Sequence, residues 1–433
     1  MYRQQIDGCL ASSVGAAGLD EGTLAKWITK AGPGLERIRA AHRDGSLPIL
    51  QIAEYRDDIP VIEERAAYHR ERADLVIVLG TGGSSLGGQA LYSLADSGFG
   101  PSGDSPKIVF LDNIDPHTFD HLFRFADLLR TDFLLISKSG GTAETIAQAL
   151  ICIEALAEVE EHDKIGEHFT VITEAKSSPL SRLAQKWGMV QIPHDPVIGG
   201  RYSSLSLVGL LPAAIAGLDP VAARRGAEPV MASLLTSTQA DPAIGAALQC
   251  GLAEERGVNA TVVMPYSDRL GTLGFWYRQL WAESVGKDGY GTLPVRAVGT
   301  VDQHSQLQLY LDGPNDKFYT VIQTPVVETG RLMRTSFAGD DSELSYLANR
   351  SMGDLFDCMQ RATADTLISN NRPTRVMTLD RVDEESVGAL MMHFIAETII
   401  ASDMWGVDAF DQPAVEEGKV LARDYLSKLP PRA

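Results

Sequence analysis

Short runs of aliphatic and β-branched residues recur along the first half of the chain, and each is followed by Gly, Ser or Thr and then by a segment with helical periodicity. Runs that are apolar at successive positions predict strands buried on both faces, as in a parallel sheet covered by helices. The predicted strands are Leu75–Leu79, Ile108–Leu111, Phe133–Ile136 and Phe169–Ile172, with predicted helices at Glu144–Val159 and Leu180–Trp187. The pattern predicts a doubly wound α/β domain over residues 45–215.

The same pattern starts again in the second half of the chain. The predicted strands are Thr261–Met264, Phe318–Ile322 and Val376–Leu379, and the predicted helices are Phe275–Ser284, Asp354–Ile368, Val387–Ala401 and Val415–Leu426. Residues 217–242 are expected to connect the two halves. We therefore divide the chain into an N-terminal helical segment (1–44), the first α/β domain (45–215) and a second α/β domain with C-terminal helices (216–433).

Composition narrows the class of protein. The chain has 433 residues, of which 44% are hydrophobic, and its formal net charge is −19. That length fits two or three globular domains. An acidic chain has no general attraction for a nucleic-acid backbone, so nucleic acid is not expected as a partner. The four cysteines lie far apart and without His at metal-binding spacing, which argues against a disulfide framework and a structural metal site.

The N-terminal sequence and the lengths of the apolar runs bear on where in the cell the protein is expected. It lacks a basic segment followed by an apolar core, so no secretory signal is predicted. No run approaches the roughly 18 consecutive apolar residues that a membrane span needs. We therefore expect a cytoplasmic protein with no membrane association.

The first of two loops rich in glycine and hydroxyl side chains follows the strand at residues 75–79. This loop, Gly80–Gly88 (GTGGSSLGG), allows backbone N–H groups to turn toward a ligand at the start of a helix. It does not match the G-x-G-x-x-G dinucleotide fingerprint, because Ser85 stands at the third glycine position, and it contains no Walker GK[ST]. Taken alone, the loop fits a tight strand–helix turn equally well.

The second loop, Ser137–Thr145 (SKSGGTAET), supplies hydroxyls, two glycines and one lysine at a helix start. Neutral donors, free amides and a helix dipole suit a phosphate monoester. Helix capping by Thr142 explains part of this composition, but it does not require the upstream hydroxyls and the lysine. Because ligands of parallel sheets bind at the carboxyl ends of the strands, we expect both loops to face one crevice that holds the phosphate of a small molecule.

Two further segments carry charged side chains suited to chemistry on such a ligand. In Gly199–Ser203, two glycines precede Arg201, whose guanidinium stays protonated and can stabilise a developing oxyanion. In the predicted helix at residues 275–284, Gln279 and Glu283 are four residues apart and share one face. Aromatic neighbours are expected to desolvate Glu283 and to raise its pKa toward the range of a general base. Taken singly, a surface Arg after a turn and a solvated Glu are the simpler interpretations.

His304, in the segment Asp302–Gln306, and Lys419, in the segment Phe410–Lys419, are the remaining candidates. A single His is more often structural than catalytic, and a Lys in an acidic terminal helix is ordinarily solvated. The position of Pro413 fits the first turn of that helix. Both residues gain significance only from the set of motifs to which they belong.

Taken in order, these motifs resemble those of the glucose-6-phosphate isomerase (phosphoglucose isomerase) family. The similar motifs are GTGGSSLG, SKSGGTAET, GGRYSSLS, QLWAESVGK, DQHSQLQ and FDQPAVEEGK, and they follow the family's order from residue 80 to residue 419. Thr81 and Ala414 depart from residues common in the family, but neither removes a chemical group. The resemblance is to the compact bacterial form, and it implies two sugar-isomerase (SIS) α/β/α domains, over residues 45–215 and 216–433, and a homodimer.

The resemblance also implies a role for each candidate residue. Glu283 matches the base that moves a proton between C2 and C1 of the sugar, and Arg201 matches the residue beside the enediolate. His304, which in the family reaches the site from the neighbouring subunit, and Lys419 match the groups that serve ring opening. The remaining matches are to substrate-binding residues: Gly83, Ser84, Ser137, Lys138, Ser139, Thr142, Gly200, Gln279 and Gln412.

The implied reaction is the reversible isomerisation of glucose 6-phosphate and fructose 6-phosphate through ring opening and a cis-enediolate, a step of glycolysis and gluconeogenesis. The reaction is redox-neutral, and one carboxylate can serve both carbons when the enediolate is stabilised, so no cofactor and no metal are expected. Two alternatives stay open from the sequence. One is a non-catalytic sugar-phosphate-binding regulator on the same domains, and the other is an isomerase for another phosphosugar.

Overall fold

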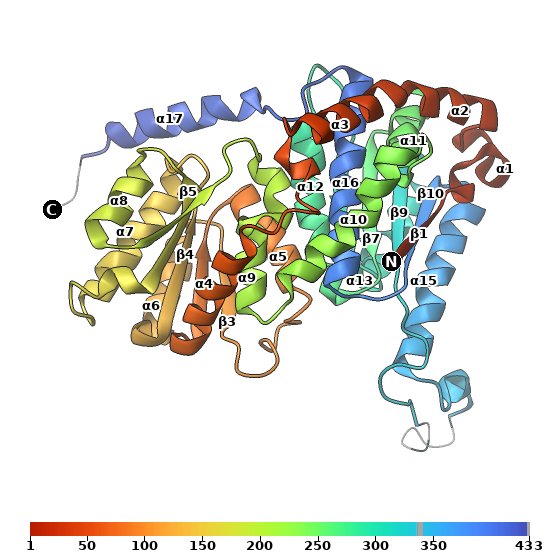
Figure 1. The fold of residues 1–433 in the computed structure, drawn as a ribbon. Coiled ribbons are helices and arrows are strands. Elements are labelled where there is room, and N and C mark those ends of the chain that lie inside the picture. The colour runs from red at the N-terminus through yellow and green to blue at the C-terminus, as the bar shows by residue number, and fades with distance from the viewer. Residues whose placement is uncertain (335, 337–340, 431–433) are drawn as a thin grey trace.

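The computed structural model describes residues 1–334, 336 and 341–430 and contains two five-stranded sheets flanked by helices (Figure 1). The first sheet consists of β2 (Leu75–Leu79), β3 (Lys107–Leu111), β4 (Thr131–Ile136), β5 (Phe169–Glu174) and β6 (Val190–His194). Its order is β3-β2-β4-β5-β6, and all neighbouring strands are parallel, with Ile77 opposite Phe133. Every residue of β4 is buried, as the apolar run predicted.

Alternate residues of the first sheet pack against different helices. Val76 and Val78 belong to the large core of the molecule, whereas Ile77 and Leu79 belong to a separate core on the other face. The helices on the first of these faces are α4 (Ile59–Arg72), α5 (Leu86–Tyr92) and α9 (Leu207–Ile215), and those on the second are α6 (Pro116–Phe125), α7 (Ala143–Ala157) and α8 (Pro179–Trp187). The sheet is therefore covered on both sides, which confirms the predicted doubly wound arrangement.

The second sheet repeats this plan with one difference at its edge. It consists of β1 (Tyr2–Gln5), β7 (Ala260–Pro265), β8 (Leu293–Arg296), β9 (Lys317–Gln323) and β10 (Thr374–Leu379), in the order β1-β10-β9-β7-β8. Four strands are parallel, and β1 is antiparallel to β10, with Tyr2 opposite Leu379. The sequence pattern therefore located the central strands of both sheets correctly.

The N-terminal segment differs from its prediction. Residues 1–44 were expected to be helical, and they do contain α1 (Ala11–Val14), α2 (Glu21–Lys30) and α3 (Gly32–Asp44), but the chain begins with strand β1. The sequence of β1, YRQQ, is polar and alternates between half-buried and exposed residues. Its strand conformation comes from pairing with β10, more than 370 residues away, so local pattern gave no signal for it.

Helices of the second half cover its sheet on both faces, with α11 (Asp241–Arg256), α12 (Leu273–Val285) and α16 (Glu384–Trp405) in the core on one face and α14 (Leu307–Asp312) and α15 (Met352–Ser369) in the core on the other. The remaining helices are α10 (Pro220–Thr236), α13 (Val301–Ser305) and α17 (Glu416–Ser427). The expected connection at residues 217–242 is mostly the helix α10. Short 3-10 helices are η1 (Asp7–Cys9), η2 (Gly15–Ala17), η3 (Pro48–Leu50), η4 (Gly82–Ser84), η5 (Leu128–Arg130), η6 (Ile165–His168), η7 (Gly200–Leu205), η8 (Asp268–Leu270), η10 (Ser342–Leu347) and η11 (Pro413–Val415).

Helix α16 forms the centre of the second half. It is long and apolar enough to cross a membrane, but 89% of its apolar window is buried within the fold. It packs beside α10, α11 and α12 (Figure 1). The buried carboxylate of Glu397 in this helix bonds to Arg375 of β10 at 2.6 Å and to His393 at 2.8 Å. The apolar length of α16 is thus accounted for by its place in the core.

Candidate active site

Two loops meet at the carboxyl edge of the first sheet. The chain passes from β2 to β3 and then returns to β4 on the other side of β2, so the direction of winding reverses between β2 and β4. Open α/β sheets bind their ligands in the crevice at such a reversal. The loop at residues 80–85, which contains η4, follows β2, and the loop at residues 137–142 follows β4.

Glycines bring the first loop against η7 and against α12 of the second half of the chain. A Cβ atom on Gly83 would lie 2.1 Å from the carbonyl carbon of Gly200, so only glycine permits this approach of η4 to η7. Gly82 has a φ of +57°, and a Cβ there would lie 2.8 Å from Nε2 of Gln279. The absence of side chains therefore places Gly83 and the adjoining Ser84 beside Gly200 and Gln279.

The second loop presents the predicted hydroxyls together. The hydroxyls of Ser137 and Thr142 are 2.9 Å apart, and Ser139 Oγ accepts a hydrogen bond from the amide of Gly141 at 3.2 Å. Thr142 precedes α7, yet within the described residues its side chain makes no capping bond to that helix. Burial, partly offset by the carboxylate of Glu174, lowers the pKa of the half-buried Lys138 ammonium. This arrangement leaves hydroxyls and a helix N-terminus at one edge of the sheet.

Glu283 lies near the end of α12 and is oriented by polar partners. Gln279, one turn earlier, donates from Nε2 to Oε1 of Glu283 at 3.0 Å, and Arg201 donates from Nη1 to Oε2 at 3.2 Å. The side chain remains 31% exposed. Of the predicted aromatic neighbours, Trp276 lies on the same face of α12 as Glu283 and donates from Nε1 to the carbonyl oxygen of Arg201 at 3.1 Å. Tyr277 and Trp281 are buried in the core, where they bond to Gln249 and Thr292.

All three nitrogen atoms of the Arg201 guanidinium group donate hydrogen bonds. Nε donates to Ser284 Oγ at 2.8 Å, and Nη1 donates to Gln412 Oε1 at 2.7 Å as well as to Glu283. Nη2 donates to the carbonyl oxygens of Ala409 at 2.6 Å and of Asp411 at 3.0 Å. The side chain is almost fully buried. Arg201 therefore links η7, the catalytic helix candidate α12 and the segment that precedes α17.

The structure does not bring His304 and Lys419 into this cluster. His304 lies on the exposed surface of α13, and it makes no hydrogen bond or ion pair within residues 1–334, 336 and 341–430. Lys419 lies on α17, is 58% exposed and pairs with Glu416 at 2.6 Å. The other predicted residues divide into two groups. Gly83, Ser84, Gly200, Arg201, Gln279 and Gln412 lie in or beside the Glu283 cluster, and Ser137, Lys138, Ser139 and Thr142 lie in the hydroxyl loop.

Residues that the sequence analysis did not assign complete the cluster. Ser284 bonds to Arg201 and to the hydroxyl of Tyr202 at 2.8 Å, and Tyr202 also donates to the carbonyl oxygen of Ala409 at 2.9 Å. Lys287 bonds to the same segment from the other side. All three lie inside the motifs GGRYSSLS and QLWAESVGK. Their membership of these motifs was therefore the one sequence signal that could have pointed to them.

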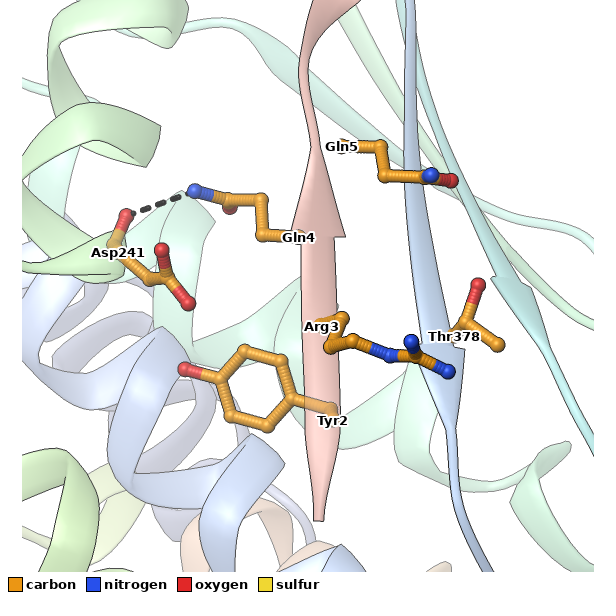
Figure 2. Close-up of a pocket in the computed structure, with 6 residues that line it drawn as sticks. All are labelled: Tyr2, Arg3, Gln4, Gln5, Asp241 and Thr378. Carbon is orange, nitrogen blue, oxygen red and sulfur yellow. Dashed lines mark hydrogen bonds between the residues drawn. The ribbon is translucent and has the colours of Figure 1, made fainter.

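A cavity beside the N-terminal strand is separate from this site. It has a volume of about 470 Å³ and lies along the edge strand β1 (Figure 2). Gln4 donates there from Nε2 to the carbonyl oxygen of Asp241 at 3.1 Å. The other lining residues are Tyr2, Arg3, Gln5 and Thr378. None of these residues belongs to the Glu283 cluster.

The comparisons with known proteins agree with this geometry. The sequence model of the family described as Phosphoglucose isomerase matches residues 63–432. The chain belongs to the phosphoglucose isomerase family. A glucose-6-phosphate isomerase from Rubrobacter xylanophilus is 38% identical over 346 residues, which are 79% of this chain and 80% of that protein. A probable glucose-6-phosphate isomerase from Haloarcula marismortui is 35% identical over 428 residues, or 97% and 93% of the two chains.

Solved structures extend the family likeness to the fold. A hypothetical protein from Thermus thermophilus has a TM-score of 0.84 and 30% identity, and the match covers 99% of this chain and all of that one. A glucose-6-phosphate isomerase from Chlamydia trachomatis has a TM-score of 0.73 at 24% identity, covering 88% and 79%, which shows a shared fold. Membership of the phosphoglucose isomerase family confirms the predicted enzyme class, an isomerase, and does not favour the non-catalytic regulator.

Proposed function

We propose that this member of the family interconverts glucose 6-phosphate and fructose 6-phosphate, with Glu283 as the proton-transfer base. The observation that carries the proposal is the paired orientation of the Glu283 carboxylate, with one oxygen bonded to Gln279 and the other to Arg201. A base must be held within reach of the reacting carbon before its pKa matters. Here two side chains from different elements fix both oxygens.

The residues around Glu283 suit a cis-enediolate. Glu283 takes the proton from C2 of the open-chain aldose and returns it to C1, while the hydroxyl proton of O2 passes to O1, so that C1 becomes a hydroxymethyl group and C2 a ketone. The reverse sequence converts the ketose to the aldose. The guanidinium of Arg201, beside the carboxylate, stabilises the negative charge that develops on the sugar oxygens. Within the described part of the chain, Oε1 of Gln279 is buried without a hydrogen-bond partner, so a sugar hydroxyl can donate to it. Gly200 and Gln412 border the same space.

The hydroxyl loop would hold the phosphate. Ser137, Ser139 and Thr142 supply hydroxyl donors, and the start of α7 adds backbone amides and the helix dipole. Ser84 and the backbone of Gly83 approach from the neighbouring loop, and Lys138 adds positive charge. An anchor away from the reacting carbons allows the binding energy of the phosphate to position C1 and C2.

Ring opening is assigned to His304 and Lys419, which requires a second subunit or a movement of α17. Every residue of α17 is exposed, and the helix projects from the body of the molecule (Figure 1). Its exposed apolar side chains are Val420, Leu421, Tyr425 and Leu426, with Leu429 beyond its end. A contiguous exposed apolar surface is typical of a protein interface. We assign it to a homodimer in which His304 completes the partner's site.

The activity is tested by incubating the purified chain with fructose 6-phosphate and a chelator, without added cofactor, and quenching before glucose 6-phosphate is measured. Formation of glucose 6-phosphate to a fixed equilibrium ratio is expected. Substrate binding without product would favour the regulator, and absence of both would point to another phosphosugar. Mannose 6-phosphate and glucosamine 6-phosphate serve as competing substrates in the same assay.

The shared site is tested by mixing two inactive variants, Glu283→Gln and His304→Ala, under conditions that exchange subunits. In a hybrid dimer one site carries both changes and the other carries neither. Random exchange yields hybrids as half of the dimers, so we expect about a quarter of the wild-type activity if His304 crosses the interface, a figure that follows from the two-fold symmetry of such dimers. If His304 served its own chain, no activity would return.

A further inference from the structure

The linker between α16 and α17, residues 406–412, is held from two sides by cationic side chains. Arg201 bonds to the carbonyl oxygens of Ala409 and Asp411 and to the side chain of Gln412. From the other side, Lys287 donates from Nζ to the carbonyl oxygen of Asp408, and it pairs with the carboxylate of Asp411 at 3.0 Å. The segment that carries Gln412 is thus clamped between these two residues.

Lys287 makes a third contact in this position. Besides the hydrogen bond to Asp408 and the ion pair with Asp411, Nζ donates to the carbonyl oxygen of Ser284 at 3.0 Å, at the C-terminal end of α12. The side chain is only 12% exposed. A cation at this end of a helix also interacts favourably with the helix dipole.

The same bonds connect Lys287 to the proposed base. Ser284 follows Glu283 directly, and while its carbonyl accepts from Lys287, its hydroxyl bonds to Arg201 Nε at 2.8 Å. Arg201 in turn touches both Glu283 and Gln412 through Nη1. A shift of the linker would therefore displace Gln412 and disturb the bond that orients the Glu283 carboxylate.

We propose that Lys287 is a positioning residue, which holds the linker against α12 so that Arg201, Glu283 and Gln412 keep their catalytic geometry. The proposal rests on the isomerase function assigned above and adds a residue to it. Lys287 contacts the linker and the end of α12, and it acts through Arg201 and Glu283. Lys287 also holds the segment that leads into α17, the helix that carries Lys419.

The test compares Lys287→Met with a matched control, Lys317→Met. Lys317 is also 12% exposed and also bonds to one carboxylate, Asp316, and to one carbonyl oxygen, that of Pro314, but it lies at the start of β9 away from the linker. Lys287→Met is expected to lower kcat by about 10- to 100-fold while KM for fructose 6-phosphate changes less than about threefold, because a small displacement of catalytic groups penalises the reaction step. Lys317→Met should leave both constants near wild type.

Three further measurements separate positioning from general structure. Lys287→Arg should restore part of kcat, because it keeps the charge and donors. Hydrogen exchange of the amides at residues 408–412 should quicken in Lys287→Met and stay unchanged in Lys317→Met. Asp411→Asn, at an exposed carboxylate, should lower kcat by a smaller factor, and it keeps the proposal testable if Lys287→Met does not fold.

The two proposals fail in different ways. A wild-type chain without isomerase activity would refute the proposed function. An active wild-type chain would leave that function in place, and the role of Lys287 would then be refuted if kcat in Lys287→Met and Asp411→Asn matched kcat in Lys317→Met.

Discussion

The two halves of the chain wind their sheets in the same order but leave different groups at the carboxyl edge. In each sheet the first parallel strand, β2 or β7, lies between the next two parallel strands, so each sheet has a reversal point. In the first half, α7 follows Thr142, whose side chain does not cap it among the described residues. In the second half, α15 starts with a capping box in which Ser351 and Asp354 bond to each other's backbone amides.

The second crevice also satisfies its own polar groups. Thr324, which follows β9, donates from Oγ1 to the carbonyl oxygen of Tyr266 at 2.7 Å, and its amide donates to Gln360 Oε1 at 2.9 Å. A cavity of about 350 Å³ remains there, with Tyr266 and Phe356 among its lining residues. The two halves show that strand order alone creates a crevice at the carboxyl edge of a sheet. Such a crevice suits an anion only where the fold leaves hydrogen-bond donors available to the ligand.

The halves also contribute different parts of the proposed site. The first half supplies the hydroxyl loop, and the second half supplies Glu283 on α12, the helix that follows β7. The close approach of Gly82 in η4 to Gln279 of α12 joins these parts. Substitutions in the two halves should therefore have separable effects on stability, substrate affinity and turnover.

The largest effect on stability is expected from Glu397→Gln, in α16, which packs beside α12. Burial alone would raise the pKa of Glu397, but Arg375 and His393 lower it to about 2. Loss of one partner of a buried ion pair costs about 3–5 kcal/mol of unfolding free energy, which chemical denaturation measures. A loss below about 1 kcal/mol would contradict this account.

The same residue gives a pH dependence with a definite sign. The pKa of Glu397 in the folded state is below its unfolded value of about 4.3, so its stabilisation is fully present above that pH and declines as the pH falls toward 2. The difference in unfolding free energy between wild type and Glu397→Gln should therefore shrink on acidification. A difference that grew at low pH would have the wrong sign.

A smaller effect, on affinity, is expected from removing two hydroxyls of the first crevice. Ser137→Ala with Thr142→Ala should raise KM for fructose 6-phosphate at least about tenfold, because each hydrogen bond to a charged group contributes about 1.5–3 kcal/mol. The matched control is Ser267→Ala with Thr329→Ala, two lining residues of the second crevice, which should leave KM unchanged. Equal KM values for the two double variants would contradict the proposal that the first crevice, and not the second, binds the phosphate.

The smallest effect is expected from the helix cap of the second half. Ser351→Ala should reduce the unfolding free energy by about 1 kcal/mol, because it removes an N-cap bond. KM for fructose 6-phosphate should not change, since α15 takes no part in the proposed phosphate site. A rise in KM comparable to that of the first-crevice variant would show that both helix starts bind substrate.

The sequence predicted the features that depend on local pattern. The strand at Leu75–Leu79 agrees with its prediction at both ends, and the helix expected at Phe275–Ser284 spans Leu273–Val285. Continuous apolar runs and a spacing of four residues carry that information within a few positions. The carboxyl-edge location of both loops was predictable for the same reason, whereas the family was predictable from the resemblance of six motifs in order from residue 80 to residue 419.

Features that depend on distant contacts were not predictable. The polar strand β1 is defined by its partner β10, and the clamp around the linker joins Arg201 to Ala409, 208 residues later. The expected aromatic surroundings of Glu283 hold for Trp276, which donates to the carbonyl oxygen of Arg201, whereas Tyr277 and Trp281 are buried elsewhere in the core. Local pattern shows that a face is buried, but it does not show which segment covers it.

The most direct test of the central claim is the turnover number of Glu283→Gln with fructose 6-phosphate, measured alongside substrate affinity by calorimetry. The account predicts that kcat falls by about 10²- to 10⁴-fold, the usual contribution of a general base. Substrate affinity should stay close to that of the wild type, because the proposed phosphate site lies in the other half of the chain. A turnover number near that of the wild type would contradict the assignment of Glu283 as the base.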